Sequence, residues 1–245
     1  MRNVFEGFML SLCFFTQLPA LYHVKNVTQK TYKYLTLFIP INGLILALLT
    51  ILFYHLLESE TNQVFVSILA SVFYLFMYGF LHLEAVADII DAYYGGHSGK
   101  DTHVILKDSN VGALGAIGTF SLVLVKVSAL SSLLISENFL AIILVLFISR
   151  LMAVFSIYSF EFHKDSKFIY SLKEPLEKNS MIVYGVLVVA GLSVFGYPWL
   201  VLPALLTTWL LKIWLMKNIG FLNGDGLGFI IEINELLLLS LLVII

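Results

Sequence analysis

Three acidic residues stand close together in an otherwise apolar segment of the sequence. Glu84, Asp88 and Asp91 fall within residues 82–91 (HLEAVADIID). On a helix of 3.6 residues per turn, their side chains stand at relative angles of about 0°, 40° and -20°, so they share one stripe. Three such carboxylates resist joint ionisation unless a cation neutralises them, and hard oxygen ligands suit Mg²⁺ or Mn²⁺. The stripe predicts a metal site; the alternative is a helix end whose acids only face water.

A second polar segment, residues 107–115 (KDSNVGALG), precedes an apolar run. Ser109 and Asn110 can cap a helix that starts here, the free backbone N–H groups at that start attract anions, and Lys107 adds positive charge. The segment therefore indicates either a phosphate-binding helix start or an ordinary capped helix. It is not a Walker loop, because no GxxxxGK[ST] pattern is present.

A third segment, residues 220–228 (GFLNGDGLG), opens the last apolar run, which also contains Glu232 and Glu235. Asp225 and Glu232 are seven residues apart and lie on one helix face, with Glu235 about 60° from Glu232. The glycines permit tight turns and close approach to a ligand. This pattern again predicts acids that enter a membrane helix from one side.

The composition requires that these segments sit in a membrane protein. Of the 245 residues, 60% are hydrophobic and 12% charged, whereas charged residues make up about a quarter of a soluble domain. The net charge of -2 provides no basic surface for nucleic acid. Cys13 is the single cysteine, which excludes an intramolecular disulfide and a thiolate zinc site. We expect one integral membrane domain, residues 1–245, with an all-α fold.

The apolar segments predict a bundle of about six or seven transmembrane helices. The N-terminal segment, which ends at Pro19, is interpreted as a helix that lies at the membrane interface or dips partway into the membrane. The turn at 196–198 splits two of the spans into a hairpin. The candidate spans are 35–57, 64–83, 113–135, 139–160, 181–196, 199–216 and 227–245.

Lys and Arg residues occur in alternate connecting segments between the candidate spans. Segments 58–63, 136–138 and 196–198 contain no Lys or Arg. By the positive-inside rule the N-terminus, the 84–112 and 161–180 segments and the 217–226 turn are predicted to face the cytoplasm, and the C-terminus to lie outside. Lys126 falls near mid-membrane, where a charge must pair, snorkel or face the bundle interior. Arg150 is interpreted as an anion-binding residue or a snorkelling one, and His82 as a packing residue or, less favoured, a base. The cations on the predicted inner side are Arg2, Lys25, Lys30, Lys33, Lys100, Lys107, Arg150, Lys164, Lys167, Lys173, Lys178, Lys212 and Lys217.

Taken in order, these motifs resemble the cobalamin synthase family, the adenosylcobinamide-GDP ribazoletransferases, over nearly the whole chain. Residues 15–19 (FTQLP) and 38–43 (FIPING) resemble the F-x-T-R-L-P and F-P-x-x-G segments of the family. The acid stripe, the 107–115 segment and the 220–228 segment resemble H-L-D-G-L-x-D-x-x-D-G, K-D-S-x-x-G-x-x-G and G-G-x-T-G-D-x-L-G. Departures from these patterns occur at Gln17, Glu84, Ala85, Ala92, Phe221 and Asn223.

The resemblance implies that α-ribazole, or its 5′-phosphate, attacks adenosylcobinamide-GDP and that GMP leaves. It implies that the acid stripe binds Mg²⁺. It also implies a multi-pass protein embedded in the lipid bilayer of the cell (inner) membrane, and it leaves open whether the protein forms a homo-oligomer. A CDP-alcohol phosphotransferase is the nearest rival, but its Arg-containing motif is absent, and a secondary transporter would need acids near the midplane. The implied roles are metal binding by Glu84, Asp88 and Asp91, catalysis by Asp91, Asp225 and Lys107, and substrate binding by Asp108, Ser109, Arg150, Asn223 and Gly224.

Overall fold

The computed structural model describes residues 2–19, 22, 24, 27–57, 62–108 and 110–245, and within them the chain forms helices and no strands. This confirms the all-α prediction. Five helices are long and apolar enough to cross a membrane, or up to seven if each of two bent helix pairs counts as one span, which is typical of a multi-pass membrane protein. The helices are α1 Arg2–Phe15, α2 Gln29–Leu57, α3 Gln63–Met77, α4 Leu81–His97, α5 Thr102–Ile105, α6 Ala113–Ile135, α7 Phe139–Ser159, α8 Lys167–Lys173, α9 Lys178–Val194, α10 Val201–Asn218 and α11 Gly224–Ile244.

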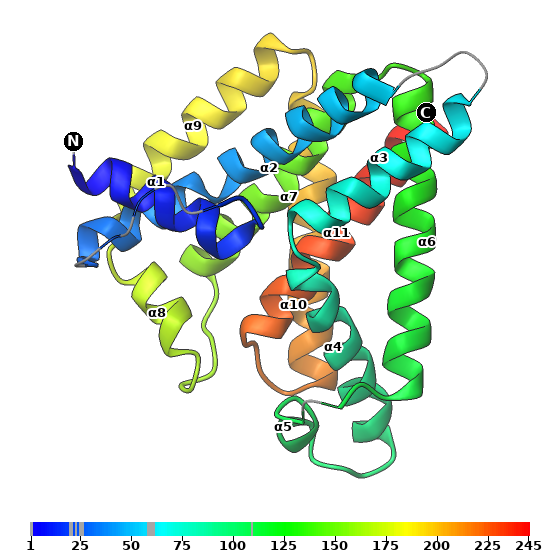
Figure 1. Ribbon diagram of the computed structural model, residues 1–245. Coiled ribbons are helices and arrows are strands. Elements are labelled where there is room, and N and C mark those ends of the chain that lie inside the picture. The colour runs from blue at the N-terminus through cyan, green and yellow to red at the C-terminus, as the bar shows by residue number, and fades with distance from the viewer. Residues whose placement is uncertain (1, 20–21, 23, 25–26, 58–61, 109) are drawn as a thin grey trace.

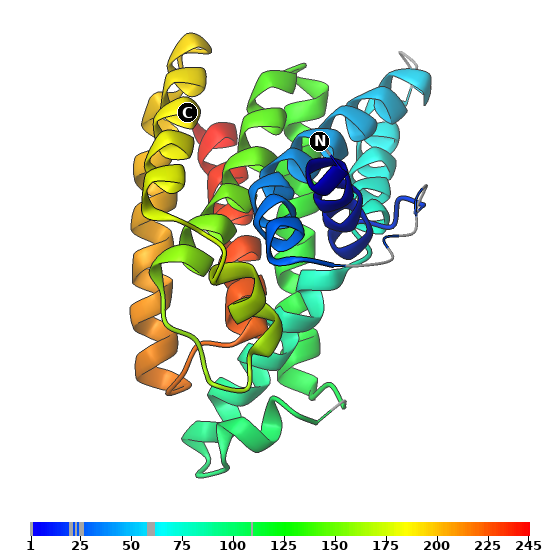
Figure 2. The ribbon, with the colours of Figure 1, turned by 90° about the vertical axis from the view of Figure 1, so that its left-hand side faces the viewer.

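Helix α7 is the centre of the bundle and contacts α2, α11, α10 and α6. Of the residues in its apolar stretch, 78% are buried, against 22% for the segment Pro198–Asn218 that includes α10. The outward side chains of α9 and α10 are mostly large and apolar, as expected for helices that face lipid. Figures 1 and 2 show α4, α5 and the turn from α10 to α11 at one end of the bundle, with the C-terminus at the other.

The second predicted span is not one continuous helix. Helices α3 and α4 meet at an angle of 83°. Between them, Gly79 has φ 70° and Phe80 has φ 56°, a left-handed conformation that ends α3 and re-aims the chain. The backbone N–H of Gln17 donates to the carbonyl of Met77 at 2.7 Å, so the segment after α1 satisfies the end of α3. The candidate span 64–83 is therefore broken before its end, and the acid stripe lies on a separate helix, α4.

The remaining boundaries follow the sequence patterns. The predicted hairpin at 196–198 is confirmed: α9 ends at Val194, and a 3-10 turn, Pro198–Leu200, leads into α10. Helix α1 packs along α2, and its buried Glu6 accepts a hydrogen bond from Arg2 at 2.8 Å. Which side of the membrane the N-terminus faces stays a prediction.

Candidate active site

Helices α4 and α11 pack against each other and bring four carboxylates together. The approach is close, since a Cβ added at Gly228 would lie 2.8 Å from the Cβ of Ala85. Asp88 interacts electrostatically with Asp225 and with the two other acids of its own helix, Glu84 and Asp91, and Asp225 interacts with Glu84. The sequence placed Glu84, Asp88 and Asp91 on one stripe; the packing adds Asp225 to it.

Asn223 holds Asp225 in place at the start of α11. Its side-chain oxygen accepts a hydrogen bond from the backbone N–H of Gly226 at 2.9 Å, which makes Asn223 the N-cap of the helix. Its amide nitrogen donates to Oδ2 of Asp225 at 2.7 Å. One side chain therefore both starts the helix and orients the carboxylate.

Asp91 has partners that the sequence did not reveal. Its Oδ2 accepts from the backbone N–H of Gly112 at 2.6 Å, and its Oδ1 accepts from that of Gly115 at 2.8 Å. These donors are the unpaired amides at the start of α6, so the anion bound there is a carboxylate of the protein itself. Added Cβ atoms at Gly112 and Gly115 would come within 2.5 Å and 2.3 Å of Asp91 oxygens. The two glycines are required because Asp91 approaches the backbone so closely.

The predicted side-chain caps of α6 are not the ones that the structure uses. The N-cap is Gly112, without a side-chain cap bond. Asn110 instead donates from its side chain to Oδ1 of Asp108 at 2.7 Å, so its interpretation as a cap is wrong. Ser109 lies outside the described residues. Asp108 accepts hydrogen bonds from the backbone and the side chain of Asn110, and the start of α6 is satisfied by Asp91 of α4.

Two of the cavities beside the acids have Gly224 in their walls. The first, of about 280 Å³, has Glu84, Asp225 and Gly224 in its wall together with apolar side chains such as Phe168 on α8. His82 also lines it, and its ring lies 6.4 Å from the ring of Tyr78, in agreement with a packing role. Acidic groups at the edge of a mainly apolar cavity suit a ligand with both a charged and an apolar part.

The second cavity, of about 340 Å³, collects residues from three distant segments. Lys107, Asn223 and Gly224, all predicted site residues, line it together with His103 and His163. Nζ of Lys107 is 3.8 Å from Oδ2 of Asp165, which belongs to the same wall. Sequence spacing carries no signal for His103, His163 and Asp165, because α5 and the segment between α7 and α8 come together only in the folded chain.

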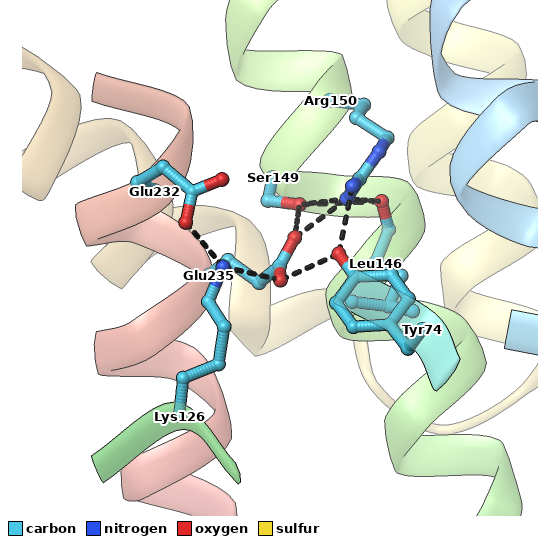
Figure 3. Close-up of polar contacts among 7 residues, drawn as sticks. All are labelled: Tyr74, Lys126, Leu146, Ser149, Arg150, Glu232 and Glu235. Carbon is cyan, nitrogen blue, oxygen red and sulfur yellow. Dashed lines mark hydrogen bonds and ion pairs between the residues drawn. The ribbon is translucent and has the colours of Figure 1, made fainter. Parts of the chain in front are cut away.

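A separate polar network lies deep between α3, α6, α7 and α11 (Figure 3). Lys126 pairs with both Glu232 and Glu235, and all three side chains are fully buried. Two cations, Lys126 and Arg150, balance the two glutamates, which is the condition for burying such charges. Glu235 is the twelfth of the 21 residues of α11, about 16 Å from its start at 1.5 Å per residue.

This network changes the interpretation of three residues. Arg150 donates to Oε2 of Glu235 at 2.6 Å and to the hydroxyl of Tyr74 at 2.7 Å, so it is occupied inside the bundle and does not lie among the acids of α4. Glu232 and Glu235 do not join Asp225 at the helix end. The expectation that all acids stay near one membrane face is therefore wrong. The deep acids, Glu232 and Glu235, are paired with Lys126 and Arg150, whereas a transporter would need acids that are free to bind an ion.

The acids of α4, together with Asp225, fit a loosely coordinated hard cation. Among the described residues, the one group with three ligand atoms within 4.8 Å of one another is His103, His163 and Asp165, so the carboxylates are spaced more widely. Mg²⁺ commonly keeps several waters and uses one or two carboxylates together with substrate phosphates. Glu84 and Asp88 match that requirement better than Asp91, whose oxygens both accept backbone N–H bonds.

Comparison with known proteins identifies relatives along the whole chain. A family model described as cobalamin-5-phosphate synthase matches residues 7–243. Proteins named adenosylcobinamide-GDP ribazoletransferase are similar to it: one from Pseudoalteromonas atlantica is 28% identical over 98% of this chain and 91% of its own length. One from Clostridium botulinum strain Okra is 27% identical over 100% of both chains, and one from Treponema denticola is 28% identical over 96% of both. No solved structure matches the chain.

Proposed function

Because the chain belongs to the cobalamin-5-phosphate synthase family and is an enzyme of this kind, we propose that it joins α-ribazole or its 5′-phosphate to adenosylcobinamide-GDP. The observation that carries the proposal is the meeting of Asp225 from α11 with Glu84 and Asp88 from α4. An anionic diphosphate needs a cation between itself and such a group of carboxylates. The relatives named for this reaction cover the same length of chain.

The reaction is a phosphoryl transfer in which bonds to one phosphorus are exchanged. The 5′-hydroxyl oxygen of the ribazole forms a bond to the corrinoid-side phosphorus, the bond from that phosphorus to the bridging oxygen breaks, and GMP leaves with that oxygen. Such reactions depend mainly on positioning and on neutralising negative charge. Mg²⁺ held by Glu84 and Asp88, with phosphate oxygens as further ligands, would supply that neutralisation.

The chain supplies the remaining functions. Asp225, oriented by Asn223, is the acceptor for the proton that the attacking hydroxyl loses. Lys107, exposed at the second cavity, binds a phosphate oxygen, and Gly224 leaves space there because no atom lies within 4 Å of a Cβ added to it. Asp108, exposed next to Lys107, stays a predicted substrate-binding residue. The apolar wall of the first cavity accepts the less polar part of a substrate.

We place this site at the cytoplasmic face of a cell (inner) membrane. The end of the bundle that carries α4, α5 and the α10–α11 turn also carries three lysines: Lys100 and Lys107 on either side of α5, and Lys217 in the last turn of α10. Connecting segments rich in Lys and Arg stay on the cytoplasmic side. Both nucleotide-derived substrates would then reach the acids from the cytoplasm.

Incubation of the detergent-purified full chain with adenosylcobinamide-GDP, α-ribazole and Mg²⁺, with GMP release and corrinoid product as readouts, tests the proposal. We expect turnover in wild type, a loss of at least about a hundredfold in Asp225→Asn if it is the proton acceptor, and a similar loss in Asp88→Asn. Glu174→Gln, the same chemical change at an exposed position away from the acids, should leave the rate unchanged. Absence of turnover in a folded, Mg²⁺-supplied wild-type protein would refute the assignment.

A further inference from the structure

We propose that His103, His163 and Asp165 form a site for a divalent transition-metal ion, separate from the carboxylates of α4 and α11. His103 lies in α5, and the other two lie in the segment between α7 and α8. Each offers one ligand atom, and these atoms all lie within 4.8 Å of one another. The site does not depend on the proposed transferase function.

The separations of the ligand atoms are close to those around a bound metal. Nε2 of His103 and Nδ1 of His163 each lie 3.7 Å from Oδ2 of Asp165. Two ligands at tetrahedral positions around Zn²⁺, with bonds of 2.0–2.1 Å, stand about 3.4 Å apart. Small side-chain rotations therefore suffice to bring the three atoms to one ion.

The two histidines are held by the same piece of chain, the turn between α10 and α11. The backbone N–H of His163 donates to the carbonyl of Leu222 at 2.7 Å, and Thr102, next to His103, donates from its hydroxyl to the carbonyl of Ile219 at 3.0 Å. The ring of Phe221 lies 5.2 Å from the His103 ring and 5.0 Å from the His163 ring. The ligand pair is thus positioned by hydrogen bonds and packing before any metal binds.

The chemistry of the set favours a borderline metal over Mg²⁺. Imidazole nitrogens suit Zn²⁺, Co²⁺ and Ni²⁺, whereas Mg²⁺ prefers oxygen. His103, His163 and Asp165 are 33%, 26% and 55% exposed, so an ion can reach them from water. The ion pair between Lys107 and Asp165 gives way when the metal binds.

The site is open rather than closed. Three protein ligands leave a coordination position for another molecule, as in catalytic zinc sites. The cavity of about 340 Å³ that contains the histidines is also lined by Asn223 and Gly224. An anionic oxygen or a nitrogen donor in that cavity can therefore become the fourth ligand.

Titration of the metal-stripped, detergent-purified full chain with Co²⁺ alone tests the site. Bound Co²⁺ is followed by its visible absorption and counted by equilibrium dialysis with elemental analysis. We expect one tightly bound ion, and an affinity that falls at least about tenfold in His103→Gln, His163→Gln and Asp165→Asn. Asp165 is exposed, so that variant separates loss of a ligand from loss of the fold.

Two matched variants serve as controls. His97→Gln changes an exposed histidine at the end of α4, and Asp88→Asn weakens the carboxylate site; both should keep the Co²⁺ affinity of wild type. The proposal is overturned if wild type binds no Co²⁺ above the level of His163→Gln, or if His97→Gln or Asp88→Asn reduces the affinity as much. Because no substrate or turnover is involved, failure here is distinct from failure of the transferase assay.

Discussion

Asp91→Asn separates a structural role for this carboxylate from a metal-binding one. Asp91 accepts backbone N–H bonds at 2.6 Å from Gly112 and 2.8 Å from Gly115. An amide keeps one acceptor oxygen and turns an NH₂ group toward the other N–H, so one of the two bonds is lost. A hydrogen bond to a charged group contributes about 1.5–3 kcal/mol, and the charge at the start of α6 about 0.3–1 kcal/mol more.

The first of these terms alone lowers the ratio of folded to unfolded protein by roughly ten- to 150-fold. Thermal unfolding of the detergent-purified protein should therefore show a clearly lower Tm for Asp91→Asn. The Mg²⁺ concentration for half-maximal turnover of the protein that remains folded should stay close to that of wild type, because the metal is assigned to Glu84 and Asp88.

Asp88→Asn is the matched comparison, since it makes the same chemical change three residues earlier on α4. Removing a carboxylate from among like charges should leave the Tm unchanged or raise it, while turnover falls. The reasoning fails if Asp91→Asn unfolds at the wild-type temperature and has lost its Mg²⁺ dependence, which would return Asp91 to the metal site.

Three further predictions concern helix packing, the buried network and the metal. Gly115→Ala should lower the Tm, because the added Cβ would lie 2.3 Å from Asp91 and 2.6 Å from the carbonyl oxygen of Ala87. The control Gly191→Ala, where no atom lies within 4 Å of the added Cβ, should keep or slightly raise the Tm. Equal Tm values for the two variants would contradict the packing argument. Lys126→Met leaves the fully buried Glu232 without its cation, so chemical unfolding should show a loss of about 3–5 kcal/mol in stability. The double variant with Glu232→Gln should recover part of this loss. If the double variant recovers none of it, the pairing of Lys126 with Glu232 is contradicted. Chelation with EDTA should stop turnover, Mg²⁺ should restore it, and full activity in excess EDTA would exclude the metal role.

The broad class of the protein follows from local features of the sequence. Hydropathy depends only on which residues are neighbours, so the all-α fold and most apolar segments could be predicted, as could the hairpin at 196–198. The stripe of Glu84, Asp88 and Asp91 depends only on the period of one helix. The ordered motifs indicated the family, and the match over residues 7–243 confirms it.

The partners of these side chains were decided by tertiary structure. Whether Asp91 binds a metal or the start of α6 depends on how closely α4 and α6 pack, and Gly112 and Gly115 reveal this only once both helices are in place. The break at Gly79 and Phe80 likewise depends on contacts made by the segment after α1.

The buried charges and the histidine cluster make the same point. Lys126 and Glu235 each looked costly alone in a membrane, and only the packing of α6 against α11 shows that they neutralise each other. His103 and Asp165 meet because α5 and the segment between α7 and α8 are both tied to the turn between α10 and α11. Local composition and helical period determined where polar groups occur along this chain, whereas the choice among partners depends on distances between helices, which the linear order of residues does not contain.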